Sequence, residues 1–222
     1  MKEKNIGINI LGWVVTVLMP LMVLMFSVRL LITPFFAKVE YRMPGFPEDP
    51  YGFSLEDRLK WSAPSIEYLV NSESITFLGT LVFEDGEPIY NASELSHMED
   101  VKAVVTGMRM ALAGLMIGLV VVSGIAVRKG RRNTLLLAIR RGGWGVLGLI
   151  AVVLLLLVVN FDQLFTWFHQ MFFTSGTWQF YTSDTLIRLF PMRFWQDAFI
   201  AVGGISLAIG ILLIVFCKPK QN

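Results

Sequence analysis

The chain has 222 residues, of which 55% are hydrophobic, with a mean hydropathy of +0.61 and a formal net charge of +2. This composition is too apolar for a water-soluble domain with a polar surface. We therefore expect an integral membrane protein.

Four apolar stretches are long enough to cross a bilayer, whose hydrocarbon core of about 30 Å takes roughly 20 helical residues. These stretches cover residues 6–28, 110–127, 142–160 and 198–217. With their flanking turns they predict membrane segments at residues 1–33, 103–128, 142–160 and 198–217. The first is longer than the apolar run of about 7–15 residues in a secretory signal, and no small-residue cleavage site follows it, so we expect a retained anchor.

A basic link, residues 129–141, joins the second and third spans. Together with Arg128 it carries six Lys and Arg and no Asp or Glu. Positive charge favours the cytoplasmic side of a membrane, so we expect this link, the tail at residues 218–222 and both termini in the cytoplasm. The link is also suited to contact anionic lipid headgroups.

The segments expected on the outer side are residues 34–102 and 161–197. The first of them carries thirteen Asp and Glu against five Lys and Arg. Nucleic acids are bound by clustered Lys and Arg, and the only such cluster lies in the cytoplasmic link. A nucleic-acid partner is therefore not expected, whereas membrane lipids are.

The acidic segment contains signals for both helix and strand. Ser54, with Asp57 three residues later, predicts the capped start of a short helix that is interrupted or restarted at Pro64. Residues 75–91, "ITFLGTLVFEDGEPIYN", predict a β-hairpin with Asp85 and Gly86 near its turn. We therefore expect a small α+β segment between the first two spans.

A helix is predicted to begin near Ser93 and to run without a break into the second span. His97, Val101 and Val104 recur on one face of it, and Glu94 extends this face outward. His97 is then placed about two turns above the apolar core, at headgroup depth.

Residues 161–197 include twelve Phe, Trp and Tyr, far more than a solvated loop tolerates. Aromatic side chains favour the membrane interface, so this segment is expected to lie along the outer surface. The chain is thus predicted to be an all-α polytopic membrane protein with four transmembrane helices, a small α+β extracytoplasmic segment and an interfacial aromatic-rich loop.

Common catalytic signatures are missing from the sequence. It contains no HExxH, GxSxG, SxxK or Walker motif. One cysteine cannot build a thiolate metal site, and the two histidines match no compact ligand spacing. We therefore expect neither a metal nor a cofactor.

The two histidines, His97 and His169, are the remaining candidates for chemistry. An imidazole with an ordinary pKa of about 6.5 can take and give protons near neutrality. Glu94 and Asp100, three residues before and after His97, can each reach its ring and fix its tautomer, as the acid of a catalytic triad does. The structural alternatives are a solvated helix residue at His97 and an interfacial aromatic with a satisfied ring nitrogen at His169.

Three other residues allow two interpretations each. Asp184 and Arg188, spaced i and i+4, predict a helical salt bridge, and the less favoured alternative is an Arg188 that binds a phosphate or a carbonyl. Trp178 is interpreted as an interface anchor, and the less favoured alternative is a place in a cofactor site.

Two long motifs resemble the bacterial family of the lipoprotein intramolecular transacylase, Lit. They are "SELSHMEDVKAV" at residues 93–104 and "FHQMFFTSGTWQFYTSDTLIRLFPMRFWQDAF" at residues 168–199. The number and order of spans are also similar, whereas residues 34–90 match only loosely. The resemblance implies that His97 and His169 are the paired functional histidines. It carries over further motif members without individual roles: Glu94, Asp100, Trp178, Asp184 and Pro191.

The resemblance also implies a reaction. Enzymes of this family move the sn-2 acyl chain of a diacylglyceryl lipoprotein to the α-amino group of the same N-terminal cysteine, which gives a lyso-form lipoprotein. A neutral imidazole can accept the proton of an amine whose pKa is about 7.7 to 8.0. We favour His169 as the base and His97 as the donor to the oxyanion or the leaving alcohol. The expected location is the bacterial cytoplasmic membrane, with the active site at its outer face.

Two other functions remain open at this point. A non-catalytic protein that binds lipids or lipoproteins would use the aromatic surface for docking and would not need the histidines. A hydrolase would use the same histidines to activate water and would release free fatty acid. Transport is disfavoured, because the four spans contain no buried charge.

Overall fold

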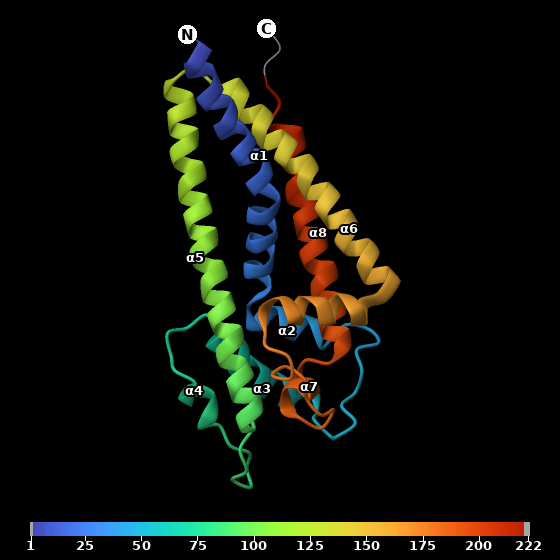
Figure 1. The fold of residues 1–222 in the computed structure, drawn as a ribbon. Helices are drawn as coiled ribbons and strands as arrows, with labels where there is room; N and C mark the ends of the chain where they lie inside the picture. Colours follow the sequence, from blue (N-terminus) through green and yellow to red (C-terminus); the bar gives the residue numbers. More distant parts are fainter. Residues whose placement is uncertain (1, 220–222) are drawn as a thin grey trace. The chain divides into compact units, whose positions relative to one another are not determined.

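The structure, a computed structural model, describes residues 2–219 and is mainly helical (Figure 1). Of the expected cytoplasmic tail at residues 218–222, the last three lie outside the described residues. The helices in chain order are α1 (Lys2–Leu31), α2 (Pro34–Glu40), α3 (Leu55–Tyr68), α4 (Thr76–Gly79), α5 (Ala92–Arg128), α6 (Arg132–Phe172), α7 (Thr185–Leu189) and α8 (Met192–Phe216).

Four of these helices, α1, α5, α6 and α8, are long and apolar enough to span a membrane. They contain the four apolar stretches of the sequence, so the predicted four-span fold is confirmed. The described chain divides into two compact units. The bundle unit holds the chain up to Arg29, residues 108–158 and the chain from Ile200 onward. The histidine unit, residues 30–107 and 159–199, contains both histidines.

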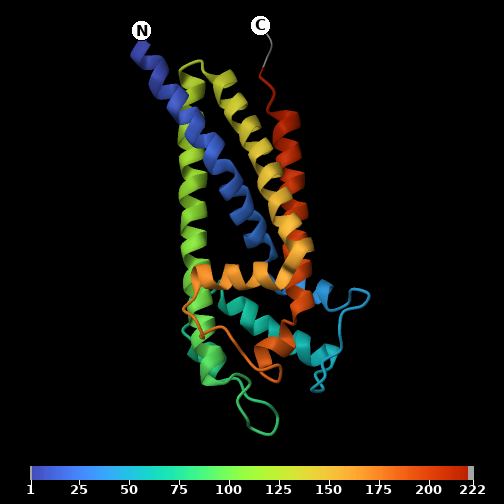
Figure 2. The same ribbon diagram turned by 45° about the vertical axis from the view of Figure 1, so that its right-hand side comes forward.

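Small residues let α6 pack closely against α1 and α8 in the bundle unit (Figures 1 and 2). A Cβ atom added at Gly142 would lie 2.5 Å from Cβ of Met19 on α1, and one at Gly143 would lie 2.9 Å from the backbone oxygen of Gly210 on α8. Small residues commonly line helix contacts in membranes, where lipid removes the hydrophobic drive for association. The contact of α1 with α8 includes a buried hydrogen bond, in which the Ser206 hydroxyl donates to Oγ of Ser27 at 2.9 Å.

In the histidine unit, α3 begins as the sequence predicts. Ser54 and Asp57 form a capping box, in which the Ser54 oxygen accepts the Asp57 N–H and the Asp57 carboxylate accepts the Ser54 N–H. The predicted interruption at Pro64 is wrong, because α3 runs through it. Trp61 and Ile66, on either side of Pro64, are buried in core clusters of this unit, and this packing compensates for the missing backbone hydrogen bond.

The predicted β-hairpin at residues 75–91 is wrong in most of its length. Its first part forms the short helix α4, and its remainder pairs only at one antiparallel bridge between Val82 and Pro88, closed by a turn at Gly86 with a φ of +88°. Proline has no N–H for a ladder, which limits pairing at Pro88. Leu78 lies in α4, and its side chain is fully buried there. The expected α+β segment is therefore a helical one within the described residues.

A break at Asn160 divides α6 (Figure 2). Its φ of −161° and ψ of 93° are not helical. Its side-chain oxygen accepts the Gln163 N–H at 3.0 Å, which is the bond of a helix N-cap. Asn160 thus ends the apolar run and begins a second helical segment, residues 161–172, where the sequence predicted a loop.

Replacing Gly143 by alanine is expected to lower stability by about 1–3 kcal/mol, because the backbone oxygen of Gly210 cannot move aside as a flexible side chain would. The thermal unfolding midpoint in detergent measures this effect. Gly148→Ala on the same helix is the matched control, since a Cβ atom there meets nothing within 4 Å. Equal midpoints for the two variants would contradict the close contact of α6 with α8.

Candidate active site

The two histidines, distant in sequence, face each other in the histidine unit. His97 lies on α5 and His169 near the end of α6, with ring centroids 6.2 Å apart and ring planes inclined by 21°. Both are buried, with exposed fractions of 9% and 8%. The only two imidazoles of the chain thus form one site.

Aromatic rings enclose this pair. Phe173 contacts both imidazoles, at centroid distances of 5.0 Å to His97 and 5.6 Å to His169. Phe180 lies 5.4 Å from His97, and Trp178 lies 4.8 Å from His169. All three rings belong to the segment that follows α6, so residues 168–180 supply both a histidine and much of its enclosure.

The tautomer of neutral His169 follows from one hydrogen bond. Its Nδ1 atom lies 2.8 Å from the backbone oxygen of Phe165, one turn earlier on α6. A carbonyl oxygen can only accept, so Nδ1 carries the hydrogen. In the neutral ring Nε2 then holds a lone pair, which is the form of a proton acceptor.

Both histidines belong to parts of their helices outside the apolar spans. The 37 residues of α5 extend over about 55 Å, more than a hydrocarbon core of about 30 Å, and its first turns carry Glu94, Asp100 and Lys102. His169 follows the break at Asn160. The pKa values of the two rings therefore depend on the protein groups around them in the histidine unit.

Burial keeps both imidazoles neutral. Burial, assisted by the neighbouring His169, lowers the pKa of His97 to about 4, against a smaller opposing effect of the Asp100 charge. Burial also lowers the pKa of His169, and the bond to the Phe165 carbonyl opposes this shift. The site near pH 7 is an uncharged pair.

The predicted role of Glu94 as the acid that orients His97 is not what the structure shows. Both Glu94 oxygens bond to backbone, one to the N–H of Asn91 at 2.8 Å and the other to the N–H of Leu186 at 2.7 Å. Asn91 in turn accepts the Glu94 N–H, which completes a cap on α5. Burial raises the pKa of the Glu94 carboxyl, and the two backbone donors oppose the rise.

Nδ1 of His97 is buried and has no hydrogen-bond partner among the described residues. Asp100, the other candidate to orient this ring, is exposed and acts on His97 only through its charge. The chain therefore leaves a polar atom of His97 available to a ligand that enters the aromatic enclosure.

The predicted salt bridge between Asp184 and Arg188 is wrong. Arg188 pairs instead with Asp49, with Nη2 and Nε at 3.0 and 3.1 Å from the same carboxylate oxygen. Its guanidinium also lies 3.4 Å from the centre of the Phe53 ring, so the alternative of an Arg188 free to bind phosphate loses its support. Asp184 accepts the N–H of Tyr181 at 2.8 Å.

Sequence reasoning missed Asp49. Burial would raise the pKa of its carboxyl, but hydrogen bonds from the Phe53 N–H and from Arg188 hold the pKa below its usual value. The partners Asp49 and Arg188 are 139 residues apart, and no local pattern links them. Their contact orders the loop before α3 against α7.

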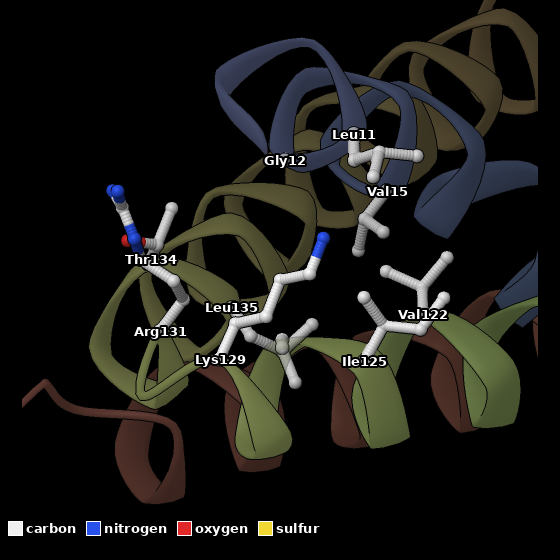
Figure 3. A pocket seen from close by; sticks show the side chains of 10 residues that line it. Leu11, Gly12, Val15, Val122, Ile125, Lys129, Arg131, Thr134 and Leu135 are labelled. Carbon is white, nitrogen blue, oxygen red and sulfur yellow. The ribbon is translucent and has the colours of Figure 1, made fainter. Parts of the chain in front are cut away.

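Two other features that could indicate a site are a hollow and a cluster of possible metal ligands. The bundle unit has a small, mostly apolar cavity between α1, α5 and α6, lined by Val15, Ile125, Leu135 and Lys129 among others (Figure 3). It contains no histidine. Within residues 2–219, no three His, Cys, Asp or Glu side chains gather as metal ligands would.

Four membrane-type helices and a buried, neutral histidine pair define an integral membrane protein with a candidate site for proton transfer in an aromatic enclosure. The chain belongs to the family of the lipoprotein intramolecular transacylase Lit, which matches residues 13–195. The resemblance seen in the two sequence motifs is thereby confirmed.

The chain is similar over nearly its full length to two solved structures of one protein and to one further relative. A solved structure of the membrane-integral lipoprotein intramolecular transacylase Lit from Bacillus cereus covers 97% of this chain and 95% of its own, with 17% identity and a TM-score of 0.73. A second structure of that protein, with one histidine replaced by arginine, gives 15% identity, a TM-score of 0.74 and coverage of 97% and 92%. An uncharacterized protein of Aquifex aeolicus (strain VF5) is 26% identical over 214 residues, 93% of this chain and 92% of its own.

Glu94→Ala is expected to destabilise the protein by about 2–4 kcal/mol, because it leaves the buried N–H groups of Asn91 and Leu186 without acceptors. The thermal unfolding midpoint should fall, and amide exchange at Leu186 should become faster. Glu99→Ala, an exposed position on the same helix, is the control and should leave both unchanged. Unchanged exchange at Leu186 in Glu94→Ala would show that the carboxylate does not hold α7.

Proposed function

We propose that the protein moves the sn-2 acyl chain of a diacylglyceryl lipoprotein to the α-amino group of the same lipoprotein's N-terminal cysteine, leaving a lyso-form product. Membership of the Lit family makes the chain a lipoprotein intramolecular transacylase and therefore an acyltransferase. The observation that carries the proposed chemistry is the buried pair of neutral histidines, one of which has a defined lone pair.

His169 is the base in this proposal. The amine nitrogen attacks the ester carbonyl carbon, a C–N bond forms, and the carbonyl electron pair moves to oxygen. The proton of the attacking nitrogen passes to Nε2 of His169, since Nδ1 is engaged by the Phe165 carbonyl. When the tetrahedral intermediate collapses, the ester C–O bond breaks and the glyceryl oxygen takes up that proton.

His97 is the hydrogen-bond donor to the departing oxygen. Its low pKa means that it acts as a neutral N–H group and not as an imidazolium. This role is supported by its Nδ1 atom, which is buried and has no hydrogen-bond partner among the described residues. A donor already in place needs no reorganisation when negative charge develops in a dry site.

The aromatic enclosure favours the amine over water as the nucleophile. Phe165, Phe173, Trp178 and Phe180 surround the imidazoles, so the site offers few polar groups to hold a hydrolytic water. The amine and the ester belong to one molecule, and a well-oriented intramolecular attack has an effective molarity of about 10⁵ M or more. Transfer is therefore favoured over hydrolysis, the second candidate reaction.

The proposed location is a bacterial cytoplasmic membrane, with the termini in the cytoplasm and the histidine unit at the outer face. The support is the charge pattern, since residues 128–141 are basic and residues 34–102 are acidic. The substrate anchor would approach from the outer leaflet, where acyl chains and the peptide N-terminus lie near each other.

Replacing either histidine by asparagine should reduce transacylation by at least about 100-fold, because general acid–base catalysis contributes about 10²–10⁴. The measurement is mass spectrometry of the N-terminal peptide of a diacylglyceryl lipoprotein after incubation with each variant. Transfer leaves the total mass unchanged, and fragmentation locates the acyl chain on nitrogen.

The same assay separates the competing functions. Loss of one acyl chain from the peptide would indicate a hydrolase, and a peptide unaltered by the wild-type protein would indicate a binding protein. Asp162→Asn, at an exposed position of α6 in the same unit, is the control and should retain activity. Full activity in both histidine variants would overturn the proposed mechanism.

The dependence of kcat/KM on pH should reflect the substrate amine alone above pH 6.5. Burial lowers the pKa of His97 to about 4 and that of His169 below its usual value, so both are mainly neutral there, whereas the amine titrates at about 7.7 to 8.0. The logarithm of kcat/KM should thus rise with a slope near one between about pH 6.5 and 7 and level off above about pH 8.5. Initial rates in zwitterionic detergent measure this profile. A slope of two in that interval would show that a histidine titrates together with the amine.

A further inference from the structure

The indole nitrogen of Trp178 is not in the environment expected for a membrane-interface anchor. Its indole Nε1 is buried and lacks a hydrogen-bond partner among the described residues. An indole N–H can only donate, and a buried donor without an acceptor is unfavourable, so a structure that keeps one needs a reason. Trp195 in the same unit shows the ordinary arrangement, with its Nε1 donating to the Phe190 carbonyl at 3.0 Å.

The position of Trp178 supplies that reason. Its ring lies 4.8 Å from that of His169, inclined by 34°, within the aromatic enclosure of the histidine pair. Its neighbour Phe180 contacts His97, so this short segment lies against both imidazoles. The unpartnered donor therefore belongs to the same enclosure as the proposed base.

One oxygen atom of the substrate receives no hydrogen bond from either histidine in the proposed reaction. The attacking nitrogen delivers its proton to His169, and the departing glyceryl oxygen faces His97 in the proposed function. The ester carbonyl oxygen remains, and it becomes an oxyanion when the nitrogen attacks. An oxyanion in a dry site requires a donor that is already in place.

We propose that the indole N–H of Trp178 is a catalytic hydrogen-bond donor to the carbonyl oxygen of the acyl group being transferred. This inference rests on the proposed function. The N–H bond of Trp178 stays intact throughout. The hydrogen bond from this N–H to the carbonyl oxygen becomes stronger as the carbonyl electron pair moves onto oxygen. It becomes weaker when the C=O bond re-forms and the C–O bond to glycerol breaks. All proton transfer occurs between the nitrogen, His169 and the glyceryl oxygen.

Trp178→Phe tests the donor while retaining an aromatic ring. We expect kcat to fall about 10²–10³-fold with little change in KM, as for the loss of one oxyanion donor. The smaller ring also loses packing against His169, so a variant that keeps the shape of the indole is needed beside it. Replacing Trp178 by the benzothienyl analogue of tryptophan, in which sulfur takes the place of N–H, keeps the ring shape and should show the same loss of kcat.

A tetrahedral mimic gives a readout that packing alone would not change. A diacylglyceryl peptide with a phosphonate in place of the sn-2 ester presents oxyanion-like oxygens. It should bind the benzothienyl variant more weakly than the wild type by about the factor lost in kcat/KM. Trp195→Phe is the matched control and should retain kcat, since its N–H bonds within the protein.

Three results would overturn the proposal: a kcat within threefold of wild type in the benzothienyl variant, a rise in KM with unchanged kcat, or equal affinity of both proteins for the phosphonate. The proposed function fails separately, if the wild-type protein produces no N-acyl peptide. A failure of Trp178 as the donor would leave that wild-type activity in place.

Discussion

The buried carboxylate of Glu94 holds together the part of the chain on which the site depends. One of its oxygens caps α5 through Asn91, and the other takes the N–H of Leu186 in α7. The segment between His169 and α7 is thereby tied at its far end to the helix that carries His97. That segment supplies Phe173, Trp178 and Phe180, so a single carboxylate constrains both the histidine pair and its aromatic enclosure.

Burial then determines the chemical state of the site. Water would stabilise an imidazolium, and the surrounding rings do not, so His97 and His169 stay neutral. The hydrogen bond to the Phe165 carbonyl leaves the lone pair of His169 on Nε2. The same apolar surroundings strengthen every hydrogen bond to developing charge and limit competition from water. In the proposed reaction, two neutral imidazoles promote aminolysis of the ester without a charged catalytic group.

Several polar groups away from the histidines form hydrogen bonds within the loops. Asp49 accepts from Arg188, whose guanidinium also lies over Phe53. Asp184 accepts the N–H of Tyr181. These bonds keep irregular segments in one arrangement beside α3 and α7. In the aromatic enclosure, Nδ1 of His97 and Nε1 of Trp178 are buried without hydrogen-bond partners among the described residues, and we propose that both bind the substrate.

Local signals in the sequence were sufficient for the four spans, for the capped start of α3 at Ser54 and for the continuous helix that carries His97. Each depends on neighbours within a few residues, namely apolar periodicity or a capping pair. The predicted hairpin at residues 75–91 is wrong because the burial of Leu78 outweighs the local strand propensity. The predicted interruption at Pro64 is wrong because the burial of Trp61 outweighs the local effect of proline.

The sequence by itself determined that this is a four-span membrane protein of the Lit family with two histidines as its candidate catalytic groups. Only the tertiary structure decided that these histidines meet, that Glu94 bonds to backbone instead of His97, and that Arg188 pairs with Asp49. These contacts join residues 72, 92 and 139 positions apart. Such partners are selected by how the whole chain packs, which no periodicity or spacing within a single segment encodes.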